Sequence, residues 1–112
     1  MSDYELPVTV SSVRHEFGTF FDRVRLLYNL TFFKEEKGYR AEAVNKYADE
    51  LFEANRISDY IHSIIGEAIE KFTLLSPTKL KEMNPAKLEQ LSKWIDISIY
   101  DINGEINDLM SR

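Results

Sequence analysis

Apolar residues recur at seven-residue intervals through the middle third of the chain, from Ala41 to Leu75. Two rows of such residues share one face of a helical projection, and only Ser58 interrupts them. The rows are Val44, Leu51, Ser58, Ile65 and Phe72, and Tyr47, Ala54, Ile61, Ala68 and Leu75. This heptad pattern is typical of a coiled coil or a bundle helix, and it predicts helix over residues 40–75.

Residues 55–58 decide whether this stretch is one helix or two. Ser58 could cap a second helix, because its hydroxyl can accept a hydrogen bond from a backbone N–H. The segment from Asn55 to Ser58 contains neither Gly nor Pro, so one continuous helix is the favoured interpretation and a break is the alternative. An unbroken helix would extend beyond a globule with a radius of gyration of about 13 Å. Its far end would then need cover from the last helix or from a second subunit.

Helical spacing continues on both sides of the central stretch. The first helix is predicted over residues 12–37, with Gly38 as its left-handed C-terminal residue, and the last over residues 85–109, with Pro85 in its first turn. Their apolar stripes are Val13, Phe17, Phe20, Val24 and Leu27, and Leu88, Leu91, Ile95, Ile99, Ile102, Ile106 and Leu109. A turn of one or two residues after the first helix predicts that the first two helices form an antiparallel hairpin.

Together these elements predict an all-α fold, a bundle of three long helices, or of four helices if the central one breaks near residues 55–58. Residues 1–112 are expected to form a single helical domain. Within it, residues 1–10 are predicted to be an extended N-terminal arm and residues 76–84 a hinge. A chain of 112 residues with 44% hydrophobic content is long and apolar enough to enclose one core.

The composition argues against several classes of function. The net charge of −5 disfavours nucleic acid as a partner, because binding to its phosphates depends on basic patches. The chain has no Cys, which excludes disulfides, thiolate nucleophiles and Cys-ligated zinc and suits a reducing, cytoplasmic compartment. The sequence shows no run of about 18 apolar residues and no secretory signal, so no contact with a membrane is expected.

Arg56 and His62 form the first candidate site. Their Arg-x(4–6)-His spacing resembles the active-site pattern of the HEPN ribonucleases, which are small all-helical dimers. The resemblance implies RNA cleavage with these two residues as the catalytic pair. On a continuous helix the two side chains would point about 120° apart, so they could converge only if the helix breaks or a second subunit contributes.

Acidic residues at helical spacing form the second candidate site. Glu67 and Glu70 are three residues apart, as are Glu105 and Asp108, so each pair shares a helical face. The two pairs resemble the E-x-x-E and E-x-x-D motifs of the MazG-type all-α nucleotide pyrophosphohydrolases. The resemblance implies a Mg²⁺ site built from these four carboxylates. The alternative is that they are ordinary acids on solvated helix faces.

Aromatic residues are more numerous in the first helix than one buried stripe requires. The surplus side chains, Phe21, Tyr28, Phe32 and Phe33, are predicted to form an interaction surface. Phe32 and Phe33 are adjacent, so they cannot both point the same way. A second chain or the N-terminal arm could cover this surface.

The favoured interpretation of function is a non-enzymatic protein–protein interaction module, with no catalytic residues, cofactor or metal site. It would be a small acidic helical regulator, an inhibitor or immunity-type protein, or an assembly subunit, and would bind its partner through an acidic or aromatic helical surface. A homodimer is expected, because the long helix and the surplus aromatic residues need cover. The alternatives are a HEPN-like dimeric ribonuclease and a MazG-like Mg²⁺-dependent nucleotide pyrophosphohydrolase.

Overall fold

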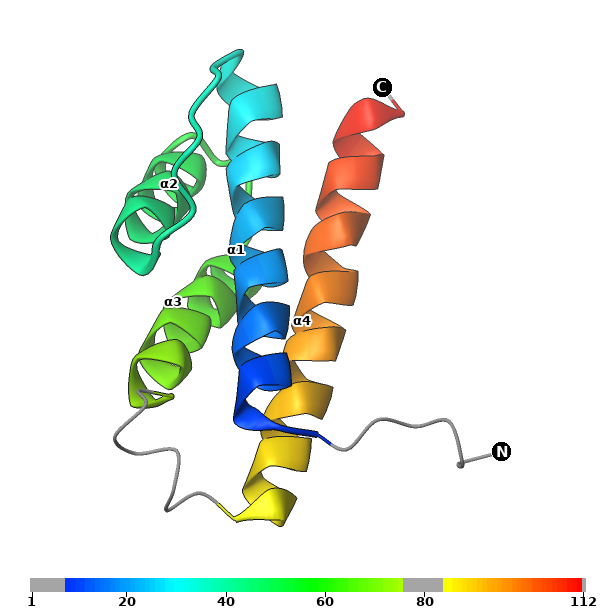
Figure 1. Cartoon of the computed structure of the whole chain (residues 1–112). Helices are drawn as coiled ribbons and strands as arrows, with labels where there is room; N and C mark the ends of the chain where they lie inside the picture. The colour runs from blue at the N-terminus through cyan, green and yellow to red at the C-terminus, as the bar shows by residue number, and fades with distance from the viewer. Residues whose placement is uncertain (1–7, 76–83, 112) are drawn as a thin grey trace.

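The computed structural model describes residues 8–75 and 84–111, and these residues form four helices and no strand (Figure 1). The helices are α1 (Val10–Phe32), α2 (Ala41–Glu53), α3 (Asp59–Leu74) and α4 (Pro85–Met110). The predicted all-α bundle is confirmed, with four helices rather than three. Residues 1–7 of the predicted arm and residues 76–83 of the predicted hinge lie outside the described residues.

A capping box begins α1, and a residue in the left-handed conformation ends it. At its start, the Thr9 side chain accepts a hydrogen bond from the Ser12 N–H, and the Ser12 hydroxyl accepts one from the Thr9 N–H, both at 3.0 Å. This reciprocal capping box starts the helix earlier than predicted. At its end, Phe33 takes the left-handed conformation with φ 55°, so α1 stops before the predicted residue 37. Gly38, the predicted left-handed residue, does not have a positive φ.

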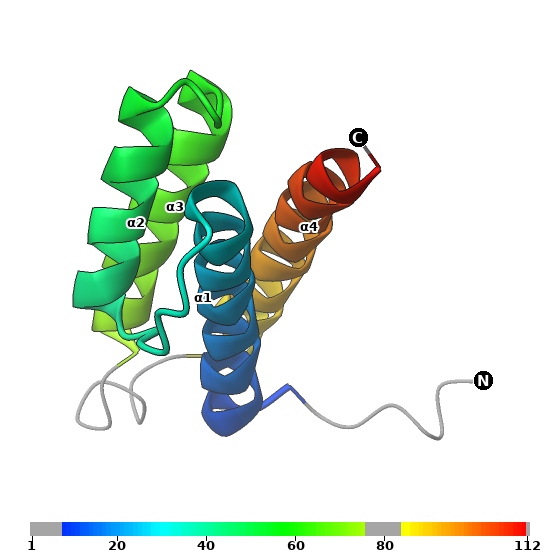
Figure 2. The ribbon, with the colours of Figure 1, turned by 90° about the horizontal axis from the view of Figure 1, so that it is seen from above.

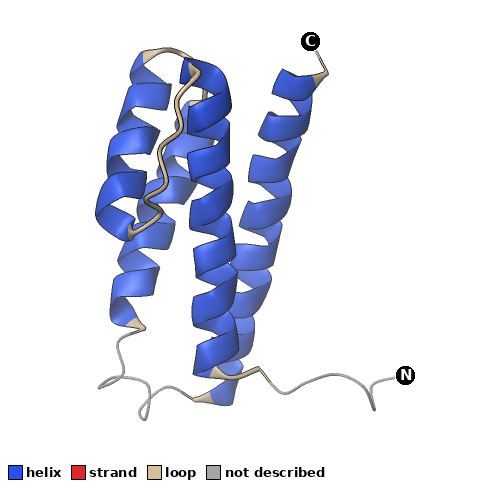
Figure 3. Ribbon diagram, turned by 45° about the horizontal axis from the view of Figure 1, so that its top comes forward, coloured by secondary structure: helices blue, strands red, loops and turns tan. Residues whose placement is uncertain are grey.

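The segment between α1 and α2 runs back along α1 instead of turning tightly. The Asn29 side chain donates to the Glu36 carbonyl at 2.9 Å and accepts from the Glu36 N–H at 3.1 Å, and Arg25 donates to the same carbonyl. Because the chain returns before α2 begins, α2 runs in the same general direction as α1 (Figures 1 and 3). The predicted one- or two-residue turn and the antiparallel hairpin of the first two helices are therefore wrong. The antiparallel pair is α2 with α3 (Figure 3).

The central stretch is two helices, so the favoured prediction of a continuous helix is wrong and the four-helix alternative holds. Asn55 adopts a left-handed conformation with φ 56°, which Asn tolerates better than most residues, and the Arg56 N–H closes the turn on the Leu51 carbonyl at 2.9 Å. Ser58 then caps α3 by accepting a hydrogen bond from the Ile61 N–H at 3.2 Å. Asn55 therefore ends α2 in the left-handed conformation that Gly most often adopts at a helix end.

The core is organised around α1, which lies between α4 on one side and the α2–α3 pair on the other (Figure 2). Its buried residues are Val13, Phe17, Phe20, Phe21, Val24, Leu27 and Tyr28. They occupy a broad face because α1 is covered from two sides. From α4, the stripe Leu88, Ile95, Ile102 and Ile106 packs into the same core. The first helix is thus the centre of the bundle.

Candidate functional site

Arg56 lies in the turn between α2 and α3 and reaches across to α4. Its Nη2 donates to the Glu105 backbone carbonyl at 3.2 Å, and its Nη1 lies 3.6 Å from the Glu105 carboxylate. The Arg56 side chain is only 13% exposed, so this contact ties the turn to the last helix. A guanidinium held in this way has a structural role in the chain.

His62 faces a different neighbour. Its Nε2 lies 3.0 Å from an Asp49 carboxylate oxygen, and its ring stacks on Phe52 with centroids 4.4 Å apart. Both partners belong to α2, whereas Arg56 contacts α4. The break at residues 55–58 therefore does not bring the two predicted catalytic side chains together within one chain.

The four predicted metal-ligating acids do not meet either. Glu105 pairs with Arg56 in the turn before α3, whereas Glu67 pairs with Lys71 in the second half of α3; each pair is 3.6 Å apart. Because α3 and α4 run in opposite directions, the second half of α3 lies beside the first half of α4 (Figure 1). Glu67 and Glu70 belong to that half of α3, whereas Glu105 and Asp108 belong to the last turns of α4. Within residues 8–75 and 84–111, no group of three or more His, Cys, Asp or Glu side chains could hold a metal ion.

The predicted aromatic surface is mostly core. Phe21 is 2% exposed and Tyr28 is fully buried, so neither can belong to an interaction surface. The α2–α3 pair covers them, with Tyr47 stacked on Tyr28 at 4.4 Å between centroids. Phe32 is half-buried against Tyr28, and only Phe33, 94% exposed, remains on the surface. The sequence predicts that a second chain or the N-terminal arm covers these aromatic residues, but α2 and α3 of the same chain cover them.

A different apolar surface lies on the solvent side of α4. Ile97 is 61% exposed and Tyr100 is 78% exposed, and helical spacing places Lys93 and Gly104 on the same side. A Cβ built at Gly104 would meet nothing within 4 Å, so the helix is bare there. We name these four residues the α4 outer face. The apolar heptad of α4 could have revealed it, because Ile97 and Tyr100 fall outside that stripe.

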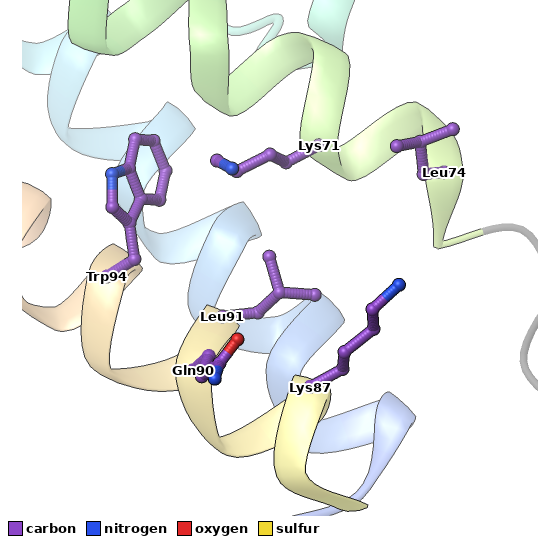
Figure 4. A pocket seen from close by; sticks show the side chains of 6 residues that line it. All are labelled: Lys71, Leu74, Lys87, Gln90, Leu91 and Trp94. Carbon is purple, nitrogen blue, oxygen red and sulfur yellow. The ribbon is translucent and has the colours of Figure 1, made fainter. Parts of the chain in front are cut away.

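A pocket of about 360 Å³ opens between the second half of α3 and the first half of α4 (Figure 4). Its lining residues are Lys71, Leu74, Lys87, Gln90, Leu91 and Trp94. The Trp94 ring is supported from below by Phe17, at 6.2 Å between centroids. The Lys71 ammonium lies 5.2 Å from the Trp94 ring centroid, within range of a cation–π interaction. No spacing pattern in the sequence reveals this pocket, because its lining residues come from two separate helices.

Two carboxyl groups meet between α1 and α4. The Ser92 hydroxyl donates to Glu16 Oε1 at 2.9 Å, and Glu16 also hydrogen-bonds to Asp96. Burial, followed by the hydrogen bond to Asp96, raises the pKa of Glu16 from 4.5 to about 7. The protonated Glu16 can donate to the Asp96 carboxylate, so the folded state holds this proton more tightly than the unfolded chain does.

Glu16→Gln is therefore expected to stabilise the protein at pH 8 and to change little at pH 4.5. The folded pKa is raised above its unfolded value, so the stability from Glu16 is complete below pH 4.5 and is lost as the pH rises through about 7. Because Glu16 is only half-buried, we expect a gain on the order of 1 kcal/mol. Urea denaturation at both pH values measures it. Glu53→Gln, on the surface of α2, controls for the loss of one charge, and an equal gain there would contradict the assignment.

Comparison of the chain with protein-family models, curated proteins and solved structures finds no match. In the part of the chain that the structure describes, no helix has the length and apolar character needed to cross a membrane. The surface chemistry of the bundle itself is therefore the basis for a proposed function.

Proposed function

We propose that this protein is a non-enzymatic protein–protein interaction module, and that it pairs with a second copy of itself through the α4 outer face. The observation that carries the proposal is the exposure of Ile97 and Tyr100, 61% and 78%, on adjacent turns of one helix. Contiguous exposed apolar side chains on a small domain mark interaction surfaces more often than isolated ones do. The surface extends onto α3, since Tyr60 is 62% exposed and donates to Asp101 at 3.1 Å.

The α4 outer face is complementary to itself when two copies run in opposite directions. A two-fold axis between residues 100 and 101 sets Ile97 of one copy against Gly104 of the other, so that a branched side chain fills the bare turn. The same axis sets Lys93 opposite Asp108, which joins opposite charges at both ends. A parallel arrangement would instead set like charges together. This charge pattern favours a second copy of the chain as the occupant.

The structural reason for a dimer differs from the reasons that the sequence offers. The central helix breaks and the surplus aromatic residues are covered within the chain, so neither requires a partner. The absence of Cys supports a cytoplasmic location, where thiols are kept reduced and disulfides are rare. The proposed module binds through an apolar surface on the last helix with one aromatic side chain, Tyr100, whereas the sequence predicts an aromatic surface on the first helix.

Tyr100→Glu is expected to convert the dimer into a monomer, because the two-fold axis sets each new carboxylate opposite Asp101 of the other copy and beside the exposed apolar side chains. Sedimentation velocity over a range of concentrations measures the mass. Ser63→Glu adds the same charge to an exposed position of α3 and is expected to remain dimeric. A wild-type protein that stays monomeric up to millimolar concentration would contradict the proposal, and so would a Tyr100→Glu variant that dimerises as the wild type does.

A further inference from the structure

We infer that the pocket between α3 and α4 binds a small amphipathic carboxylate, a molecule with one carboxylate group and a short apolar body. The inference does not depend on the pairing of two chains, because the pocket lies on the side of α4 that faces α3 (Figure 4). It rests on the combination of an apolar floor, two lysines and a volume of about 360 Å³. Pockets that take small ligands have volumes of about 300–1,000 Å³, so this one suits a ligand at the small end of that range.

The floor of the pocket is apolar and firmly supported. Leu74 comes from α3, and Leu91 and Trp94 from α4, with the Leu91 side chain between the two lysines (Figure 4). Phe17, which has no exposed surface, lies beneath Trp94 and also contacts Phe72 at 6.1 Å between centroids. A floor held by the buried core loses little conformational freedom when a ligand covers it, which favours binding.

The walls of the pocket supply positive charge in a chain that is acidic overall. Lys71 and Lys87 come from opposite helices, and the described residues that line the pocket include no carboxylate. Lys87 lies in the first turn of α4, where the helix dipole adds to its positive potential. In a protein of net charge −5, two ammonium groups beside one apolar floor select an anion with an apolar body.

Two contacts position the Lys71 side chain at the edge of the pocket. Its ammonium lies over the Trp94 ring, at 5.2 Å from the centroid, and 3.6 Å from the Glu67 carboxylate. Glu67 is half exposed and does not line the pocket, so it competes with a bound anion for the same ammonium group. Removing the charge of Glu67 should therefore strengthen the binding of an anion, whereas removing the charge of Lys71 should weaken it.

Titration with octanoate tests the inference, because Trp94 is the single tryptophan of the chain and its fluorescence reports directly on the pocket. We expect a saturable change in the fluorescence of the full-length protein, with a dissociation constant below about 1 mM. Octylammonium, which has the same apolar body and the opposite charge, is expected to give no saturable change. Octanol is expected to bind at least tenfold more weakly than octanoate does.

Matched variants assign the binding to the two lysines. Lys71→Met and Lys87→Met keep most of the apolar stem and remove the charge, so each should weaken octanoate binding at least tenfold while circular dichroism stays unchanged. Lys46→Met, on α2 and away from the pocket, should bind octanoate as the wild type does, and Glu67→Gln should bind it more tightly. The inference would be overturned if octanoate showed no saturable binding, or if octylammonium bound equally well. It would also be overturned if both lysine variants kept wild-type affinity, or if the pocket bound an acidic peptide but not octanoate.

Discussion

Phe17→Ala is expected to lower the free energy of unfolding by about 3–5 kcal/mol, the range measured when a buried aromatic side chain is truncated. Phe17 has no exposed surface and contacts aromatic rings of three helices. Its ring centroid lies 6.4 Å from that of Phe21, 6.1 Å from Phe72 and 6.2 Å from Trp94. The substitution therefore leaves a cavity where α1, α3 and α4 meet, and surrounding helices cannot all collapse into it. Urea denaturation of the two proteins measures the difference.

Phe33→Ala is the matched control for this prediction. It makes the same change at a side chain that is 94% exposed, so we expect an effect within about 0.5 kcal/mol. The Trp94 fluorescence gives a second measurement, because loss of the ring beneath it should admit water and shift its emission to longer wavelength. Equal destabilisation by the two substitutions would contradict the position of α1 at the centre of the bundle.

Arg56→Ala is expected to lower the free energy of unfolding by about 2 kcal/mol. The side chain is 13% exposed and joins the α2–α3 turn to Glu105 of α4. Truncation would leave Glu105 without this partner and would remove the packed stem of the arginine. Breaking a fully buried ion pair costs about 3–5 kcal/mol, and we expect less here because the Glu105 side chain is 33% exposed and water can reach it.

The same variant separates a structural role for Arg56 from a catalytic one. Arg40→Ala removes an exposed arginine from the start of α2 and should change stability by less than about 0.5 kcal/mol. Incubation of purified protein with RNA provides the second measurement. The bundle geometry predicts no cleavage that depends on Arg56 or His62. Cleavage by the wild type that is lost in Arg56→Ala, while the fold remains intact, would favour the ribonuclease alternative.

The helical pattern in the sequence was enough to predict the class of fold but not the path of the chain. The apolar stripe of α4, for example, is buried at Ile95, Ile102 and Ile106 as its spacing indicates. The favoured interpretation of a continuous central helix fails before α3, because the rule that Gly or Pro ends a helix does not cover Asn55 in the left-handed conformation. The return of the chain along α1 depends on Asn29 and Arg25, which both donate to the Glu36 carbonyl, and a helical spacing pattern does not predict such side-chain contacts with a loop.

Surface sites were harder to predict than the fold. A single buried stripe would leave Tyr28 on the surface, but α1 is covered from two sides and buries a broader face (Figure 2). The spacing of Arg56 and His62, and of the paired acids, describes positions along the sequence and not contacts between helices. In the bundle, Arg56 contacts Glu105 of α4, whereas His62 contacts Asp49 of α2. The pocket joins Lys71 and Trp94 from helices that are distant in sequence, so only the packing of α3 on α4 could reveal it.

Disulfide trapping between two copies of α4 tests the central claim most directly, because the chain has no Cys of its own. Ile97→Cys and Gly104→Cys variants would be oxidised separately and as a mixture, with Ser63→Cys as a surface control. Antiparallel pairing predicts that the mixture forms a crosslinked dimer joining residue 97 to residue 104 faster than either variant alone. Crosslinking of the mixture no faster than that of the Ser63→Cys control, or only between identical positions, would contradict the account.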